Sequence, residues 1–348
     1  MRGGERVLEL LCQGFPSAPI LTLIHNRGAV SPVIEGHPVT TTWLQRVPGV
    51  MRWYRYFLPF FPSAVESLRV PEADLLISTS HCVAKGHRAP AGGKHLCYCF
   101  TPMRYAWTFY EEYFGANPLK KAVLSPILGS LRDWDRRTAA GVDRFVTLSR
   151  HVQDRIRRFY GREADVVYPP VNTDYFTPGR AEGGGFDLVV SALVPYKRLD
   201  LAVAAYTRLA YPLKIVGTGT EFPALRKVAG PKVEFLGWQD DEKVRELYRD
   251  CRCLVFPGEE DFGIVPVEAQ ACGRPVVAFG RGGVTESVVG GVTGVFFQEQ
   301  SEAALLAAVE ECAARRWDPA AIRRNAERFG VQPFIHGLDR SIRACMGL

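Results

Sequence analysis

Residues 251–286 read CRCLVFPGEEDFGIVPVEAQACGRPVVAFGRGGVTE. The segment contains two apolar runs, CRCLVFP (251–257) and PVVAF (275–279), which have the composition of buried strands. Between them, a polar loop leads into a helical pattern near residues 264–272. A strand, a helix and a second strand in so short a segment predict a βαβ unit with parallel strands.

The same alternation extends back to residue 186. The near-continuous apolar run FDLVVSALV (186–194) is expected for a strand that is buried on both faces. Strands and helices then alternate, with strands predicted at 212–217 and 233–237 and helices at 199–209, 221–228 and 240–249. The pattern predicts one doubly wound α/β domain over about residues 170–315.

The first half of the chain carries a noisier version of this pattern. Between aromatic-rich segments such as residues 51–68, strands are predicted at 19–25, 74–80, 94–100 and 143–149. The segment 168–185 is rich in Pro, Gly and Asn, which is typical of a linker.

We therefore expect two doubly wound, Rossmann-like domains, at residues 1–168 and 169–318. Residues 319–348 are predicted to form two helices that pack back toward the N-terminal domain. Ligands of open α/β sheets bind at the carboxyl ends of the strands, so the chemistry is expected in a cleft between the two domains.

The chain opens with Gly3 and Gly4, which lead directly into an amphipathic helix from Glu5 to Leu11. In a doubly wound domain, a strand normally precedes such a glycine loop. The first strand of the N-terminal sheet is therefore expected to be missing, through a misassigned start codon or a truncated sequence. The alternative is an ordinary helix start with nothing missing.

Composition limits the class of protein. The chain has 348 residues, of which 47% are hydrophobic and 23% charged, as in soluble globular proteins of about two domains. The sequence shows no apolar run of membrane-spanning length and no secretory signal, so we expect a cytoplasmic location. The nine cysteines include two CxC pairs in apolar runs, which favours buried thiols over a metal site.

The formal net charge is +6, and the densest basic stretch runs from Arg144 to Arg162. Such a stretch is either a solvated helix face or a surface for phosphates or anionic lipid headgroups. It is not accompanied by a nucleic-acid-binding motif, so we do not expect nucleic acid as a partner.

Two carboxylates, Glu260 and Glu268, flank the predicted start of the helix near Ile264. Glu260 lies in the preceding loop, and the side chain of Glu268 leans back toward the helix N-terminus. The free N–H groups of Gly263, Ile264 and Val265 and the helix dipole make this end a natural site for a pyrophosphate. Carboxylates repel phosphate, so we expect Glu260 and Glu268 to bind hydroxyl groups of a ribose and a sugar.

The segment resembles the family 4 glycosyltransferases, which have the two-domain GT-B fold. The resemblance is carried by the E-x7-E pair, the G-x-P-V-V sequence and a glycine loop that ends in Glu: Glu260, Glu268, Gly273, Arg274, Pro275, Val276, Val277, Gly282, Gly283 and Glu286. It implies that Glu268 binds the ribose of a nucleotide, that Glu260 contacts the transferred sugar, and that the backbone of 262–265 holds the distal phosphate.

A second element of the resemblance is SALVPYKRLD (191–200). The family commonly has an Arg and a Lys here, both on the pyrophosphate; Lys197 matches the Lys, whereas Ala192 stands in place of the Arg. Arg198 either substitutes for it or faces solvent at the start of a helix. Gly217 and Gly219 are expected to form a turn near the nucleotide, and Trp238 lies where the family binds the base, as a stacking or a packing residue.

The N-terminal half resembles a bacterial subgroup of mannosyltransferases that use GDP-mannose for O-antigen or exopolysaccharide synthesis. The matching segments are SHCVAKG (80–86), the run from Cys97 to Phe114, and MRGGERVLEL (1–10), so Gly3 and Gly4 are candidate donor-binding residues. His81 is predicted at a strand end facing the cleft. Lys85 and Arg104 are candidates for phosphate or acceptor contacts, the alternative being solvated charges. The chain departs from the subgroup at Phe100 and Thr108, where His and Asp are usual.

The resemblance implies a retaining hexosyltransferase without a metal or other cofactor. Its donor would be GDP-mannose, and its acceptor a lipid-linked oligosaccharide at the cytoplasmic membrane. The catalytic candidates are Glu260, Lys197 and His81. Two alternatives remain open: another GT-B enzyme, such as a nucleotide-sugar epimerase, and an inactive relic that binds a nucleotide-sugar or a partner.

A lipid-linked acceptor calls for peripheral membrane contact. Two segments are candidates. The first is MRWYRYFLPFF (51–61), in which Arg52 and Arg55 alternate with aromatic residues, and the second is the Arg144–Arg162 stretch. The alternative is an interior aromatic helix and a solvated basic face.

Overall fold

The computed structural model describes residues 3–107, 118–179, 183–209 and 211–348. The chain divides into two compact units. Unit 1 comprises Met1–Pro169 together with Ile335–Leu348, and unit 2 comprises Pro170–Phe334. The division lies one residue from the boundary predicted between residues 168 and 169.

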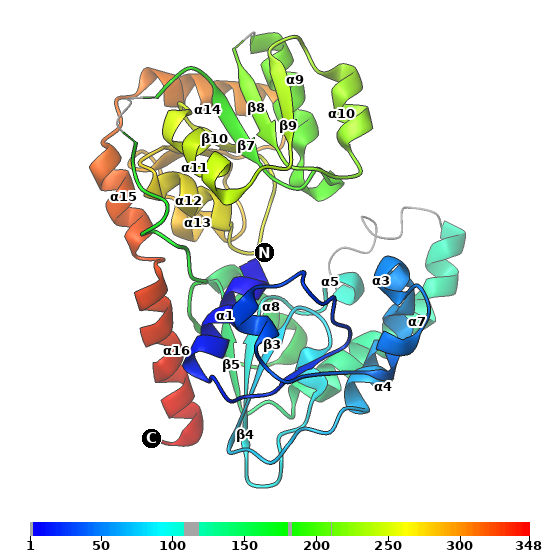
Figure 1. Ribbon diagram of the computed structural model, residues 1–348. Helices are drawn as coiled ribbons and strands as arrows, with labels where there is room; N and C mark the ends of the chain where they lie inside the picture. Colours follow the sequence, from blue (N-terminus) through cyan, green and yellow to red (C-terminus); the bar gives the residue numbers. More distant parts are fainter. Residues whose placement is uncertain (1–2, 108–117, 180–182, 210) are drawn as a thin grey trace. The chain divides into compact units, whose positions relative to one another are not determined.

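Unit 2 is built on a parallel sheet of six strands in the order β12-β11-β10-β7-β8-β9. Figure 1 labels β7, β8, β9 and β10 of this sheet. The strands are β7 (Asp187–Val190), β8 (Leu213–Val216), β9 (Val233–Gly237), β10 (Leu254–Phe256), β11 (Val276–Phe279) and β12 (Gly294–Phe297). The predicted alternation of strands and helices is confirmed, and β12 is an additional strand that the sequence pattern did not indicate.

Helices cover both faces of this sheet. The helices α9 (Leu199–Leu209) and α14 (Glu302–Ala314) pack on one face, where Val255 and Val277 of the strands join their apolar residues in one core cluster. The helices α11 (Asp241–Asp250) and α12 (Ile264–Ala271) contact β7, β10 and β11 from the other face. The short helices α10 (Phe222–Val228) and α13 (Val284–Ser287) follow β8 and β11. Coverage of both faces explains why these strands read as continuous apolar runs.

Unit 1 contains a four-stranded parallel sheet in the order β3-β4-β5-β6 and a separate parallel pair, β1-β2. The strands are β1 (Ile20–Thr22), β2 (Val39–Thr41), β3 (Leu75–Ser80), β4 (Lys94–Cys99), β5 (Arg144–Thr147) and β6 (Ala164–Val166). The strand predicted at 19–25 is thus shorter than expected and pairs with β2 outside the larger sheet. The described chain starts with α1 (Gly3–Gly14), which contacts α2 and β3.

The connections of unit 1 are mostly short helical segments. They are α2 (Pro32–Glu35), the 3₁₀ helix η1 (Trp43–Arg46), α3 (Val50–Trp53), the 3₁₀ helix η2 (Tyr54–Phe60), α4 (Phe61–Glu66), the 3₁₀ turn η3 (Ala84–Gly86) and α5 (Arg104–Trp107). Two longer helices follow, α7 (Pro118–Ala139) and α8 (Arg150–Tyr160). Only part of the basic stretch is therefore a helix, because Arg144 lies in β5.

The two C-terminal helices divide between the units. Helix α15 (Pro319–Glu327) packs on α12 of unit 2, where the amide of Asn325 donates to Gln270 at 2.7 Å. Helix α16 (Val331–Met346) continues into unit 1, where the hydroxyl of Ser341 donates to Asp165 at 2.8 Å. The expectation that both helices pack back toward the N-terminal domain is thus corrected for α15. This helix packs on α12 of unit 2 through buried polar contacts.

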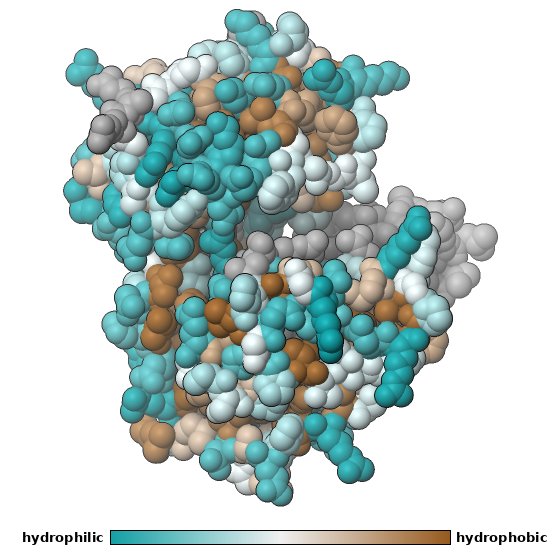
Figure 2. Space-filling view, in the orientation of Figure 1, coloured by the Kyte–Doolittle hydropathy of each residue, from teal (hydrophilic) through white to brown (hydrophobic). Residues whose placement is uncertain are grey.

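All nine cysteines are buried and free, which confirms the prediction of buried thiols. Among the described residues, no helix is long and apolar enough to cross a membrane. Hydrophilic side chains cover most of the face shown in Figure 2, and the brown apolar residues form small separate groups.

Candidate active site

The order of the strands in unit 2 creates a switch point between β7 and β10. From β7 the chain winds outward through β8 and β9, and it then returns to the other side of β7 to form β10, β11 and β12. The loops after β7 and β10 therefore leave the sheet in opposite directions, and open α/β sheets bind their ligands at the carboxyl ends of the strands at such a point. Lys197 follows β7 and Glu260 follows β10, so the two predicted catalytic residues of unit 2 lie at this switch point.

The side chains of Lys197 and Glu260 form an ion pair. Both are partly exposed, at 14% for Lys197 and 25% for Glu260, so the pair lies at the surface of unit 2 and not in its core. An ammonium group has three donor protons and therefore serves more than one acceptor. The structure brings together the cation expected on a diphosphate and the carboxylate expected on a sugar.

Glycines hold the backbone around Glu260 in close contact with its neighbours. A Cβ on Gly258 would lie 2.9 Å from the Cα of Lys197, and a Cβ on Gly283 would lie 2.2 Å from the carbonyl oxygen of Asp261. The N–H of Gly283 donates to the carbonyl of Glu260 at 2.8 Å. The glycine loop after β11 thus supports the loop that carries Glu260, which gives a physical reason for the G-G-x-x-E part of the motif.

Helix α12 begins directly after this loop. Its N-cap is Gly263, with φ 88° and ψ 82°, a residue with no side chain to accept a hydrogen bond from the first turn. The first-turn N–H groups, including those of Ile264 and Val265, carry the positive end of the helix dipole. The predicted phosphate-binding backbone is therefore a helix N-terminus three residues beyond Glu260.

Glu268 lies within α12 and is 8% exposed. The hydroxyl of Tyr248, from α11, donates to its Oε2 atom at 2.9 Å. Burial, together with the charge of Glu268, raises the pKa of Tyr248 well above its usual range, so the phenol remains a donor. Glu268 is thus held in one orientation by α11; its contact with a ribose stays a prediction.

Arg198 has the left-handed conformation, with φ 54°. Its guanidinium donates to both carboxylate oxygens of Asp200 and to the amide oxygen of Gln300, each at 3.0 Å. The side chain of Arg198 thus links two loops of the protein and does not extend freely into solvent, while its contact with the pyrophosphate stays a prediction. Gln300 is a residue of this region that sequence reasoning missed.

Gly217 and Gly219 form the predicted turn after β8. A Cβ on Gly217 would lie 1.9 Å from the carbonyl oxygen of Ser191, and a Cβ on Gly219 would lie 2.1 Å from that of Leu193. The turn therefore lies directly against the loop that leads to Lys197. Trp238 follows β9 and is 75% exposed, so it is not a packing residue; stacking on a base stays a prediction.

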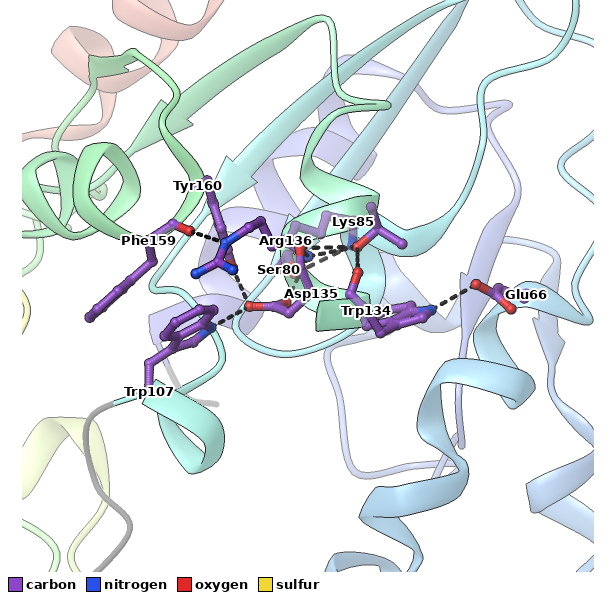
Figure 3. A network of polar contacts seen from close by, with 10 residues as sticks. Glu66, Ser80, Lys85, Trp107, Trp134, Asp135, Arg136, Phe159 and Tyr160 are labelled. Carbon is purple, nitrogen blue, oxygen red and sulfur yellow. Dashed lines mark hydrogen bonds and ion pairs between the residues drawn. The ribbon is translucent and has the colours of Figure 1, made fainter. Parts of the chain in front are cut away.

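In unit 1, Lys85 is not available to a ligand. It is 1% exposed, and its Nζ donates to Oδ1 of Asp135 at 2.7 Å. Figure 3 shows that Asp135 also accepts from Trp107 at 2.8 Å and from Tyr160 at 2.7 Å. The prediction that Lys85 contacts a phosphate or acceptor is therefore wrong, and so is the alternative of a solvated charge, because a buried ion pair occupies the residue.

The other predicted residues of unit 1 lie on several different elements. His81 is exposed and directly follows β3, and Arg104 begins α5 after β4. Gly3 and Gly4 lie in the first turn of α1, and a Cβ on Gly4 would meet the Phe100 ring at 3.4 Å. Thr108 lies outside the described residues.

Comparison with known families supports the resemblance along most of the chain. The sequence model described as Glycosyltransferase Family 4 matches residues 1–175, which is half of the chain, and the model described as Glycosyl transferases group 1 matches residues 173–329. The chain belongs to glycosyltransferase family 4. The two matched segments meet at the linker between the two units.

Relatives of this glycosyltransferase include proteins with assigned names. The D-inositol 3-phosphate glycosyltransferase of Geodermatophilus obscurus is 32% identical over 238 residues, which are 59% of this chain and 53% of the relative. The uncharacterized glycosyltransferase MJ1178 of Methanocaldococcus jannaschii is 28% identical over 165 residues, or 46% of either chain. The chain thus spans about half the length of the relatives it matches.

Solved structures share the fold over nearly the full chain. Anabaena HepE in complex with UDP aligns with a TM-score of 0.71 and 17% identity, covering 99% of this chain and 96% of that one. The apo lipopolysaccharide outer core galactosyltransferase WaaB aligns with a TM-score of 0.67 and 15% identity, with the same coverage. Together with the larger parallel sheet of each unit, these likenesses show the GT-B fold.

Proposed function

We propose that this glycosyltransferase transfers a hexose from a nucleoside diphosphate sugar to an acceptor, with retention of configuration at the anomeric carbon. The observation that carries the proposal is the ion pair between Lys197 and Glu260 at the switch point of unit 2. Glu260 lies three residues before Gly263, the N-cap of α12. A cation, a carboxylate and a helix N-terminus match the charge and the hydroxyl groups of such a donor.

The leaving group in this reaction is a nucleoside diphosphate. As the bond from the anomeric carbon to the phosphate oxygen breaks, negative charge develops on the diphosphate, and Lys197 and the N–H groups at Gly263–Val265 stabilise it. The departing oxygen accepts the proton of the acceptor hydroxyl on the same face of the sugar, which gives retention. Glu260 binds sugar hydroxyls and orients the ring, so the protein supplies positioning and charge stabilisation.

This arrangement supplies positive charge to the diphosphate without a metal ion or another cofactor. We propose that Lys197 and the end of α12 perform the role that a divalent cation has in other transferases, because both place positive charge beside the expected position of the diphosphate.

For the donor, we propose GDP-mannose, on the resemblance of the N-terminal segments to mannosyltransferases. UDP-hexoses are the second candidate, because the similar protein HepE was solved with UDP and with UDP-glucose. A thermal-shift comparison of GDP, UDP and ADP separates the bases, because stabilisation rises with the ratio of ligand concentration to dissociation constant.

Product analysis tests the reaction itself. With GDP-[14C]mannose or a radiolabelled UDP-hexose and a lipid-linked acceptor, we expect label in the lipid fraction and an anomeric configuration equal to that of the donor. Lys197→Ala should abolish this transfer. Appearance of an epimerised nucleotide-sugar would identify an epimerase instead, and absence of any product with all donors would identify an inactive relic.

For the acceptor, we propose a lipid-linked oligosaccharide reached from the cytoplasmic membrane surface. The supporting feature is an aromatic patch on η1, α3 and η2 of unit 1, formed by Trp43, Met51, Trp53, Tyr56 and Phe60. All five side chains are at least 42% exposed, and the segment 43–61 carries three arginines and no acidic residue. Exposed aromatic side chains with basic neighbours suit the headgroup region of an anionic bilayer.

A further inference from the structure

Arg198 has an unusual backbone conformation. Its φ and ψ of 54° and 38° are left-handed, and no other non-glycine residue with positive φ occurs in the described part of the chain. This conformation is unfavourable for a residue with a Cβ, so surrounding contacts must hold it. Arg198 directly joins Lys197 to the first residue of α9, and its N–H donates to the carbonyl of Pro195 at 3.0 Å. Its conformation therefore fixes how the chain leaves Lys197.

The guanidinium of Arg198 is bound at both ends. Its Nε and Nη2 atoms donate to the two carboxylate oxygens of Asp200, each at 3.0 Å, which holds the side chain against the first turn of α9. Its Nη1 atom donates to Oε1 of Gln300 at 3.0 Å. Gln300 lies between β12 and α14, so this bond connects the loops that follow β7 and β12.

Gln300 extends the connection to a third loop. Its Nε2 atom donates to the carbonyl of Pro257 at 3.1 Å, and Pro257 directly follows β10. The next residue, Gly258, packs against the backbone of Lys197, where a Cβ would lie 2.9 Å from the Cα. The contacts thus form a closed ring that passes through the loops carrying Lys197 and Glu260.

We infer that Arg198 and Gln300 are positioning residues. They fix the position of Lys197 relative to Glu260 and do not touch the donor themselves. The inference rests on the proposed function, because it assigns the pair to the same site. A glutamine suits this place because its amide accepts from the guanidinium and donates to a carbonyl at the same time. A carboxylate there would keep the first bond and lose the second.

Kinetic variants test this role. Arg198→Gly removes the guanidinium but suits the left-handed backbone, and Gln300→Ala removes both amide bonds. We expect each to lower kcat about tenfold or more, since small displacements of reacting groups are costly, while the dissociation constant for the nucleoside diphosphate changes less than about threefold. The double variant should be no slower than the single ones, because the two residues act as a unit. Gln300→Glu should restore only part of the rate.

The matched control is Arg208→Ala. Arg208 also links α9 to α14, through an ion pair with Glu302, but it is 74% exposed and lies near the end of α9 that is far from Arg198 in sequence. We expect wild-type kinetics from this variant. The inference is overturned if Arg198→Gly weakens nucleotide binding more than about tenfold while Gln300→Ala does not, because Arg198 would then contact the diphosphate directly. It is equally overturned if neither variant changes kcat.

Hydrogen exchange followed by mass spectrometry tests the ring of contacts without turnover. Arg198→Gly should accelerate exchange in residues 257–263, and Gln300→Ala should accelerate it in residues 194–199, both relative to Arg208→Ala. Unchanged exchange in the remote loop would contradict the inference. If the wild-type protein transfers no sugar, the proposed function fails, whereas this measurement still decides whether the loops are coupled.

Discussion

Glu260 and Glu268 belong to one segment of the chain, but their surroundings give them different properties. Glu260 is one quarter exposed and pairs with Lys197, which leaves it in contact with solvent and accessible to a ligand at the switch point. Glu268 is 8% exposed and fixed by the Tyr248 hydroxyl. A fixed carboxylate suits recognition of one donor component, whereas the paired carboxylate suits the reacting sugar.

The first prediction separates these two roles. Glu268→Ala should weaken nucleotide binding by about 1.5–3 kcal/mol, the contribution of a hydrogen bond to a charged group. Glu260→Ala should lower turnover and leave nucleotide affinity nearly unchanged. Calorimetric titration with the preferred nucleoside diphosphate and steady-state kinetics measure both quantities.

Tyr248→Phe serves as the control for Glu268. It removes the hydroxyl that orients Glu268 but leaves the carboxylate in place, so it should cost about 1–2 kcal/mol of stability and lower nucleotide affinity less than Glu268→Ala does. Equal losses of affinity in Glu260→Ala and Glu268→Ala would contradict the division of roles. If Tyr248→Phe lost as much nucleotide affinity as Glu268→Ala, the effect of Glu268→Ala would come from a disturbed fold and not from a lost contact with the nucleotide.

The second prediction concerns His95 in β4 of unit 1. This side chain is fully buried, with its Nε2 atom 2.8 Å from the Ser78 hydroxyl. Burial lowers its pKa from 6.5 to about 4, and nearby His87 and Lys85 act in the same direction. Below about pH 6.5, His95 is therefore protonated in the unfolded chain but stays neutral in the folded chain. Above that pH it does not lower the free energy of unfolding, which then decreases as the pH falls toward 4.

By pH 5 the loss from His95 should reach about 2 kcal/mol. Urea unfolding of the full chain at pH 7.5 and at pH 5 measures the change for the wild type and for His95→Gln. Other groups also titrate in this range, so the difference between the two proteins isolates His95. Identical pH dependence in both would show that His95 is not held neutral by the fold.

At the scale of elements, the sequence was informative where strands are covered on both faces. In unit 2, β7, β10 and β11 were recognisable because each is a short run of apolar residues between turn signals. In unit 1, β2 and β6 have three residues each and several half-buried positions, so they carry no periodicity to detect, and β1, also of three residues, is shorter than the strand predicted at 19–25. Such strands are set by pairing with distant partners.

The candidate site was predictable to the same extent. The resemblance to the family pointed to both Lys197 and Glu260 and the structure pairs their side chains, while their roles toward a donor stay predictions. Gln300 reaches Arg198 from 102 residues away and only through the order of the sheet, which no local pattern indicates. Lys85 was misjudged for the same reason, because its partner Asp135 is 50 residues distant and a lone lysine gives no sign of burial.

The third prediction concerns the contact between two loops of unit 2. In Gly283→Ala, the new methyl group would lie 2.2 Å from the carbonyl oxygen of Asp261, so the glycine loop must move away from the loop of Glu260. Overpacking of this kind costs about 1–3 kcal/mol, and displacement of Glu260 should lower kcat about tenfold or more. Thermal unfolding and steady-state kinetics measure the two effects.

Gly185→Ala is the matched control for this change. Its added Cβ meets nothing within 4 Å, and its backbone is not left-handed, so stability and activity should both stay close to wild type. If Gly283→Ala also behaves like wild type, the glycine loop does not position Glu260.

At the scale of the whole molecule, the two basic surfaces proposed for membrane contact differ in how their charge is balanced. In the Arg144–Arg162 stretch, Arg144 pairs with Asp165, and Arg157 pairs with both Asp154 and Glu163. The aromatic patch lies in a segment without acidic residues, and the guanidinium of Arg52 sits 5.0 Å from the centre of the Trp53 ring. Charge balance therefore favours the aromatic patch over the basic stretch as the lipid-binding surface.

The patch also has the continuity that a docking surface requires. The rings of Trp43 and Phe60 are 6.5 Å apart, those of Trp53 and Tyr56 are 5.8 Å apart, and α3 contacts both η1 and η2. Beneath it, Leu58 and Phe61 are buried in the core of unit 1, so the exposed rings stand on a fixed base. The segment 51–61 is thus an interior element on one side and an aromatic surface on the other, and neither alternative considered from its sequence describes it fully.

The last prediction is salt-sensitive binding of the full chain to vesicles that contain phosphatidylglycerol. Arg46→Glu combined with Arg52→Glu should weaken binding more than tenfold at low salt, because each arginine near an anionic surface contributes about 1 kcal/mol. Trp53→Ala should weaken the part of the binding that persists at high salt, since that part comes from ring insertion at the interface.

Arg158→Glu combined with Arg226→Glu makes the same charge change at exposed positions outside the patch, and it should bind like wild type. Cosedimentation at low and high salt measures binding of the wild type and the three variants, with phosphatidylcholine vesicles as the uncharged reference. If both double variants lost binding equally, net charge and not the aromatic patch would direct the protein to the membrane.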